Sequence, residues 1–204
     1  MSDNSGAPKE SGRPGNVADY RFAFESESPD TYRVRKIEGV DGLSRLFTYR
    51  VDLVCGDDTE EPQETVGRAV VLEISGAAGS RQIFGIVREW NFEGVGVHVL
   101  YYSAEIVPPH WMLTHRFCSR VFRAHMCSDM TVTGILKQVL KDAGFPDTAL
   151  RVAASGSYPA RDFVVQYRET DMDFVSRLLE EEGIFYFLVL LQFSCPQNAP
   201  AGPV

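Results

Sequence analysis

Long apolar runs are missing from this sequence of 204 residues. No stretch is long enough to span a bilayer as a helix, which needs about 20 mostly apolar residues in succession. The first residues, SDNSGAPKESGRPGN, also lack the apolar core of a secretory signal peptide. These absences argue against stable membrane insertion and predict that the chain is made in the cytoplasm.

Cysteine and positive charge are also scarce. The chain has 4 cysteines, and in the cytoplasm we expect them to remain free thiols. Its 20 basic residues are outnumbered by 28 acidic ones, which gives a net charge of −8. Because a nucleic-acid backbone is itself negative, this charge argues against general nucleic-acid binding and against an anionic membrane surface.

The motifs of familiar catalytic and cofactor sites are absent too. No G-x-S-x-G, H-E-x-x-H or phosphate-binding loop occurs. The stretch Glu93 to Gly96 lies between two predicted strands, so we interpret it as a hairpin turn rather than a phosphate loop. The acidic pairs at 57–58 and 60–61 indicate a solvated loop. We expect no catalytic residue and no cofactor.

One group of side chains has the right chemistry for a metal site: His115, Cys118, His125 and Cys127. Its spacings are His-x-x-Cys and His-x-Cys, whereas structural zinc sites favour Cys-x-x-Cys or His-x(3–5)-His pairs. The same residues offer a thiolate–imidazole pair, but nothing nearby supplies an orienting group or an oxyanion hole. We therefore expect no metal and interpret them as packed or surface residues.

Short alternating segments dominate the first half of the chain and predict a closed antiparallel barrel. The six predicted strands are 20–24, 32–38, 47–55, 69–74, 81–91 and 97–107. In the third of them, one face carries Phe47, Tyr49, Val51 and Leu53. Residues 2–16 are polar and rich in Gly, Ser and Pro, so we expect a disordered leader.

Helical signals begin after Pro108-Pro109, where the barrel should end. A short helical turn at 111–115 and a short strand at 120–122 are predicted first. A helix then begins at Thr131 or Thr133 and ends near Gly144. The predicted fold class is mainly β (α+β), an antiparallel barrel followed by a small region that contains helices.

The stretch from Arg161 to Phe187 predicts a strand, a helix and a further strand. Phe163, Val165 and Tyr167 alternate with Val164, Gln166 and Arg168, which is typical of a half-buried strand. Thr170 and Asp173 can cap the following helix, and Gly183 can end it. The buried helix face should carry Phe174, Val175, Leu178 and Leu179. The new strand should start at Ile184.

Three glutamates, Glu180, Glu181 and Glu182, crowd the C-terminal end of this helix. Negative charge is unfavourable there because of the helix dipole. Arg177 can relieve Glu180 and Glu181 through i+3 and i+4 contacts, and Asp173 can share that arginine. A solvated helix end is one interpretation. We prefer an interface or a cross-strand arginine contact that involves these three glutamates and Arg177.

A small basic patch comprises Arg116, Arg120 and Arg123, beside Phe117 and Phe122. Single-stranded nucleic acids are bound by such mixtures of cations and aromatic rings. On an acidic chain, a protein interface or internal ion pairs explain the patch equally well.

The segment VQYRETDMDFVSRLLEEEGIFYF closely resembles the type VI secretion spike proteins of the valine-glycine-repeat (VgrG) family, which in turn resemble the baseplate hubs of contractile phage tails. Weaker agreement runs through 43–47, 85–87, 101–113 and 120–122. The resemblance covers roughly residues 19 to 187, but only the front part of a full-length spike protein.

The resemblance implies a mechanical role. Spike proteins of this family are homotrimers whose hub barrels form a ring that docks on the secretion tube, and the assembled spike carries effectors through the type VI apparatus. It implies no catalytic residues in this region. The domains expected are a disordered leader (1–18), a first hub barrel (19–107), a helix-containing hub region (108–187) and an atypical tail (188–204).

The end of the sequence, LVLLQFSCPQNAPAGPV, departs from the family and predicts a truncated or frameshifted hub fragment. The run Ile184 to Phe193 is uncharged and should form a sticky strand with an unpaired edge. A stand-alone phage-tail-like hub, or an effector adaptor without enzymatic activity, is the alternative function.

Overall fold

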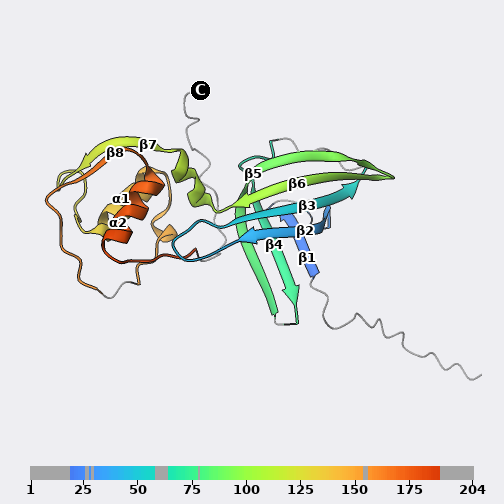
Figure 1. Cartoon of the computed structure of the whole chain (residues 1–204), viewed down its shortest axis with the longest axis horizontal. Helices are drawn as coiled ribbons and strands as arrows, with labels where there is room; N and C mark the ends of the chain where they lie inside the picture. Colours follow the sequence, from blue (N-terminus) through green and yellow to red (C-terminus); the bar gives the residue numbers. More distant parts are fainter. Residues whose placement is uncertain are drawn as a thin grey trace, which may run out of the picture.

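The structure is a computed structural model that describes residues 19–25, 28, 30–57, 64–77, 79–153 and 156–188. It has two parts, a closed β-barrel and a smaller module of two strands and two helices (Figure 1). The predicted fold class is therefore confirmed. The division of the chain at 18, 107 and 187 stays a prediction.

The barrel has six antiparallel strands in the order β1-β2-β3-β6-β5-β4. They are β1 (Asp19–Phe24), β2 (Tyr32–Val40), β3 (Thr48–Gly56), β4 (Ala69–Gly76), β5 (Gly79–Gly96) and β6 (Val99–Val107). The predicted inner face of β3 is buried at all four positions. Its side chains meet Phe22 and Phe24 of β1 in one core, so alternation along each strand fills the barrel.

The hairpin between β5 and β6 differs from the prediction. A turn was expected at Glu93 to Gly96, but β5 continues through Gly96 and the chain turns at Val97 and His98. The register shifts between Phe92 and Gly94, so Gly94, at φ +147°, belongs to a β-bulge rather than to a turn. A glycine within alternating residues marks either feature, and the sequence alone favoured the wrong one.

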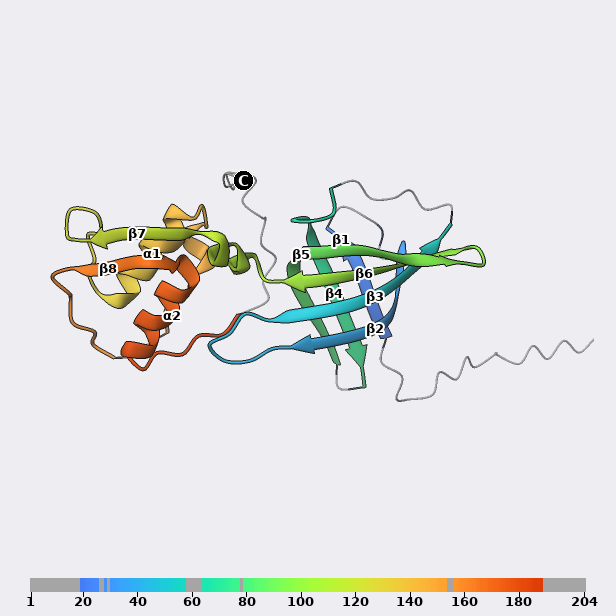
Figure 2. The same cartoon turned by 45° about the horizontal axis from the view of Figure 1, so that its top comes forward.

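The module follows the barrel through a short 3-10 helix. Its elements are η1 (Pro109–His115), β7 (Phe117–Phe122), α1 (Val132–Asp142), η2 (Asp147–Ala149), β8 (Val164–Thr170) and α2 (Asp171–Glu181). Both helices lie on one side of the β7–β8 sheet (Figure 2). Phe122 and Val164 on that side of the sheet pack against the apolar faces of α1 and α2. No described helix is long and apolar enough to cross a membrane.

Helix α2 begins and ends at the predicted residues. The Thr170 hydroxyl accepts the Asp173 N–H at 3.0 Å and donates to the Asp173 carboxylate at 2.7 Å. At the other end Gly183 has φ +66°, a conformation that costs a side chain energy. Its N–H donates to the Glu180 carbonyl, and the Ile184 N–H donates to the Leu179 carbonyl. These two bonds form a Schellman motif and end the helix.

The segment after α2 is a second connection between the two parts. No strand forms over 184–188, so the strand predicted from Ile184 is wrong in this stretch; residues 189–193 lie outside the described residues. Ile184 and Tyr186 pack on the module core, whereas Leu188 packs on the barrel core. The Tyr186 carbonyl also accepts the Ser44 N–H at 2.8 Å. Packing on two cores therefore replaces strand pairing here.

Candidate functional site

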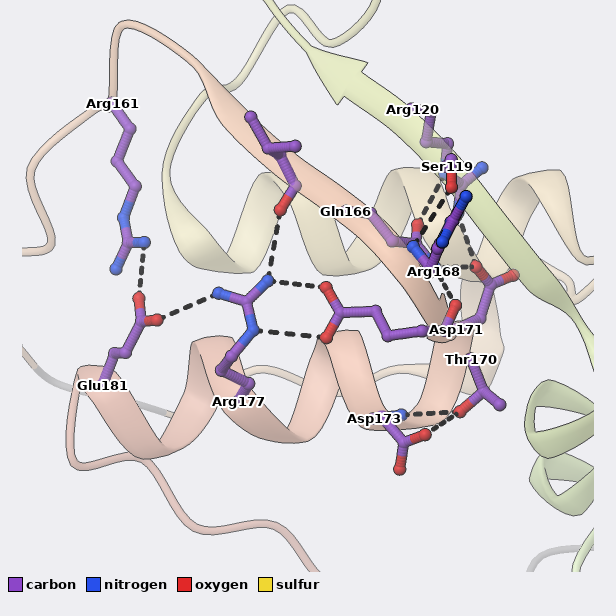
Figure 3. Close-up of polar contacts among 12 residues, drawn as sticks. Ser119, Arg120, Arg161, Gln166, Arg168, Thr170, Asp171, Asp173, Arg177 and Glu181 are labelled. Atoms are coloured by element: carbon purple, nitrogen blue, oxygen red, sulfur yellow. Dashed lines mark hydrogen bonds and ion pairs between the residues drawn. The ribbon is translucent and has the colours of Figure 1, made fainter.

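The predicted interface residues gather along α2 (Figure 3). Arg177 donates to Glu181 at 3.1 Å, which confirms the predicted i+4 pair. Its other nitrogens donate to the Glu169 carboxylate at 2.7 and 3.3 Å and to the Val165 carbonyl at 3.2 Å. Arg177 thus ties α2 to strand β8 as well as supporting the helix end.

The other two predicted partners of Arg177 are wrong. Among the described residues, neither Asp173 nor Glu180 forms an ion pair with it. Asp173 is held by the helix cap at Thr170. The Nε and Nη2 atoms of Arg177 instead donate to Glu169, which lies on strand β8.

Arg161 is a further partner of these glutamates that the sequence did not single out. It lies just before β8, and its two terminal nitrogens donate to Glu181 at 2.7 Å and to Glu182 at 2.6 Å. The Arg161 guanidinium holds the pKa of Glu181 below its usual value, with a smaller contribution from Arg177. Of the two arrangements preferred from the sequence, an arginine contact within the chain is therefore present.

Glu180 remains as the exposed member of the triple glutamate. It forms no ion pair within the described part of the chain, whereas Glu181 and Glu182 both do. The helix end therefore keeps one negative charge that is free to meet another molecule. An interface role for Glu180, Glu181, Glu182 and Arg177 stays a proposal.

A second polar cluster centres on Asp171, whose side chain is 0% exposed. Its carboxylate accepts from Arg116 Nε at 2.8 Å, from Arg120 Nη2 at 2.8 Å and from Gln166 Nε2 at 2.9 Å. Arg120 also donates to Asp142 at the end of α1 at 3.0 Å. A buried charge is tolerated only when it is paired and hydrogen-bonded, and this one has three donors. The cluster joins β7, β8 and both helices.

The predicted basic patch is largely used inside the molecule. Arg116 and Arg120 form ion pairs with Asp171. Phe122 is buried and stacks on Phe174, with the two ring centres 5.4 Å apart. Phe117 alone of the two patch aromatics is exposed. Internal ion pairs therefore explain the patch better than a nucleic-acid site does.

The outward face of the β7–β8 sheet is apolar. Phe117, Val121, Phe163, Val165 and Tyr167 lie on it and are exposed, whereas Val164 and Gln166 on the opposite face are buried. The usual arrangement would bury the more apolar face. The alternation predicted a half-buried strand correctly, but the buried face is the less apolar one.

The histidine and cysteine candidates do not come together. Within the described residues no group of three or more His, Cys, Asp or Glu side chains is placed to hold a metal ion. The Cys127 thiol is buried and donates to the Asp129 carbonyl at 2.9 Å. His115 packs edge-on against Trp111. Burial raises the pKa of both Cys118 and Cys127, which disfavours the reactive thiolate.

Comparison with known proteins decides the family. Residues 40–192 match the family described as the phage tail baseplate hub (GPD), which is most of the chain. The chain belongs to the phage tail baseplate hub family. The described part of the match contains the β7–β8 sheet, both helices and most of the barrel, so both parts of the structure are hub elements.

Curated relatives come from type VI secretion. The spike protein VgrG1c of Pseudomonas aeruginosa is 34% identical over 185 residues, which covers 85% of this hub chain and 24% of that protein. VgrG1a of the same bacterium is 34% identical over 160 residues, 78% of this chain and 24% of that protein. The chain thus spans about a quarter of the length of these relatives. The predicted resemblance to the hub region of the spike proteins is confirmed.

Solved structures support the same fold. The Escherichia coli c3393 protein, described as a component of the type VI secretion system, matches with a TM-score of 0.65 and 22% identity over 83% of this chain and 42% of its own. A 43 kDa tail protein of a Shewanella oneidensis prophage matches with a TM-score of 0.58 and 14% identity over 82% and 49%. The barrel and the helical module are therefore a shared hub architecture.

Proposed function

We propose that this chain is a structural subunit of a type VI secretion spike hub that forms a homotrimer, docks on the secretion tube and helps to carry effectors. The family match over 40–192 is the observation that carries this proposal. Before assembly the subunit resides in the cytoplasm, and it leaves through the type VI apparatus as part of the spike.

The two parts of the subunit are built to move as one body. The barrel is closed, so its strands brace one another around the whole circumference. The module is attached at two places, by the chain through η1 and by the 184–188 segment through Ser44 and Leu188 (Figure 1). A hub that transmits a push needs this kind of double attachment, because a single linker would let the module swing.

No part of the proposal requires enzymatic activity. The Asp171 and Arg177 clusters are built from ion pairs that hold elements together, and they include no nucleophile–base pair. One relative, the actin cross-linking toxin VgrG1 of Vibrio cholerae, is 30% identical over 180 residues, but the match covers only 16% of that toxin. Hub sequence thus occurs within a larger toxin there, which supports effector transport as the role of the hub.

Docking on the tube is tested by co-purification. The tagged full chain and the tube protein encoded by the same genome are expressed together, and the tube protein is measured in the eluate. A tagged, unrelated acidic barrel protein is the control for charge. We expect this chain to retain the tube protein and the control protein not to retain it. An eluate without the tube protein would contradict hub docking and would leave the adaptor as the alternative function.

A further inference from the structure

The barrel and the module meet at η1, and two neighbouring rings of η1 contact the two parts (Figure 1). Trp111 contacts the barrel, where the Arg88 guanidinium of β5 lies 5.8 Å from the centre of its ring. His110 contacts the module, where its ring stacks on Phe145 with the ring centres 4.9 Å apart and 11° between the planes. A single turn of 3-10 helix is therefore held on both sides.

The His110 ring lies against an apolar cluster of the module. Phe145 is buried together with Leu113 of η1 and Leu140 of α1. The ring is hydrogen-bonded to the backbone of Ala149, which packs on the same cluster. Its Nδ1 atom is buried. A neutral imidazole suits this position, because a charged ring would have to leave water for an apolar surrounding.

The charge of His110 is not balanced by a neighbouring side chain. The elements around η1 carry these charged or titratable residues: Arg88 on β5, His115 and Arg116 at the end of η1, Lys141 and Asp142 on α1, Asp147 on η2, Glu169 on β8, and Asp171 and Asp173 on α2. Within the described part of the chain, none of them contributes to the pKa of His110. A protonated ring would therefore lack a counter-charge in the closed joint.

The sign of the pH effect follows from this position. Burial lowers the pKa of His110, and the hydrogen bond to Ala149 offsets only part of that shift. A ring that has swung out into water takes up a proton at the ordinary pKa of about 6.5. The contact with Phe145 is therefore fully stabilising above that pH, and acid favours the state in which the ring is exposed.

We propose that His110 is an acid-sensitive latch: its neutral ring holds η1 against the module, and its protonated ring leaves Phe145 and loosens the joint between module and barrel. The covalent chain and the 184–188 segment still attach the module, so acid permits it to swing without releasing it. The latch acts within one copy, so it is independent of the assembly in the proposed function.

Hydrogen exchange in the natural chain tests the latch. Amides in 109–116 and 143–150 report on the joint, since the Trp111 and Phe145 N–H groups donate to the Pro108 and Leu140 carbonyls. Amides of β3 report on the barrel core. Protection factors, which correct for the effect of pH on intrinsic exchange, are compared at about pH 8 and about pH 5.

The joint should lose protection by about fivefold to thirtyfold between the two pH values, whereas β3 should change by less than about twofold. The upper limit is set by the open state, because a ring with a pKa of about 6.5 is about thirtyfold protonated at about pH 5. A natural chain whose joint keeps its protection in acid, or which loses as much in β3, overturns the latch.

Two matched variants assign the effect to one ring. His110→Phe keeps an aromatic ring to stack on Phe145 but cannot take up a proton, so it should keep its protection in acid. His115→Phe is the control, because His115 also lies on η1 but packs against Trp111, and it should respond like the natural chain. The latch is wrong if His110→Phe still responds to acid or if His115→Phe no longer does.

An NMR titration of the natural chain is a second measurement that needs no variant. The His110 ring signals should titrate at a lower pH than the value of about 6.5 for an exposed histidine. The loss of protection at the joint should follow the same titration curve. A His110 ring that titrates at or above that value, or a loss of protection at an unrelated pH, contradicts the latch while leaving the hub function untouched.

Discussion

Arg120 on β7 donates to Asp171, the first residue of α2, over 2.8 Å. The two residues are 51 positions apart in the sequence. Their ion pair fixes the start of α2 against the sheet, while the carboxylate is closed off from water. The position of the whole helix, including the charged end with Glu180, depends on this pair.

Replacing Asp171 with asparagine should therefore destabilise the subunit. The variant keeps the size of the side chain but leaves Arg116 and Arg120 without a buried counter-charge, which should cost about 3 kcal/mol. The measurement is the free energy of unfolding in urea. Asp173→Asn, two residues along on the exposed side of α2, is the control and should cost less than about 1 kcal/mol. An equal loss of unfolding free energy in the two variants would show that the buried ion pairs of Asp171 do not stabilise the subunit more than the exposed cap at Asp173 does.

How far the sequence predicted this structure depends on the distance over which each signal acts. Thr170 and Gly183 were predicted as caps because a cap is decided within four residues. Strand positions in the barrel followed from alternation in the same way. The two arginine partners of Asp171 lie 55 and 51 positions away in the sequence, so no local pattern indicated these ion pairs.

The orientation of β8 shows a different limit. Alternation divides Phe163, Val165 and Tyr167 from Val164 and Gln166, but it does not state which set faces the core. Gln166 is buried because it bonds Asp171 and Arg120, and that network was invisible in the sequence. The exposed aromatic face follows from the same cause. The register shift between β7 and β8 at Cys118 and Arg120 also depends on pairing with a distant strand, so the sequence of β8 alone does not reveal it.

Acid should weaken the helix end. The pKa of Glu181 in the folded chain is below its usual value, because Arg161 donates to the carboxylate. Its stabilising contribution is full above that value and is lost as the pH falls through the lowered pKa. The melting temperature of Glu181→Gln should therefore lie below that of the natural chain at about pH 7, and the difference should shrink at about pH 3.

Glu180→Gln is the matched control for this pH effect, since Glu180 lacks an ion pair among the described residues. Its difference from the natural chain should stay small at both pH values. The account of Glu181 fails if the difference for Glu181→Gln is constant or grows in acid.

Strain at Arg168 predicts an unusual gain in stability. Glycine adopts φ near +48° without the steric cost that any side chain carries, whereas alanine keeps that cost. Arg168→Gly should therefore be more stable than Arg168→Ala by about 1 kcal/mol, measured by urea unfolding. Both variants lack the guanidinium, so the comparison isolates the backbone. Equal free energies of unfolding for Arg168→Gly and Arg168→Ala would mean that the backbone at Arg168 holds no strain.

The native mass of the full chain tests the central claim, self-assembly as a hub, most directly. Light scattering and native mass spectrometry are applied to the purified chain, whose single-copy mass is 22.8 kDa. The account predicts a discrete species of three copies at micromolar concentration that dissociates on dilution. A chain that remains a single 22.8 kDa copy over the whole concentration range would contradict it.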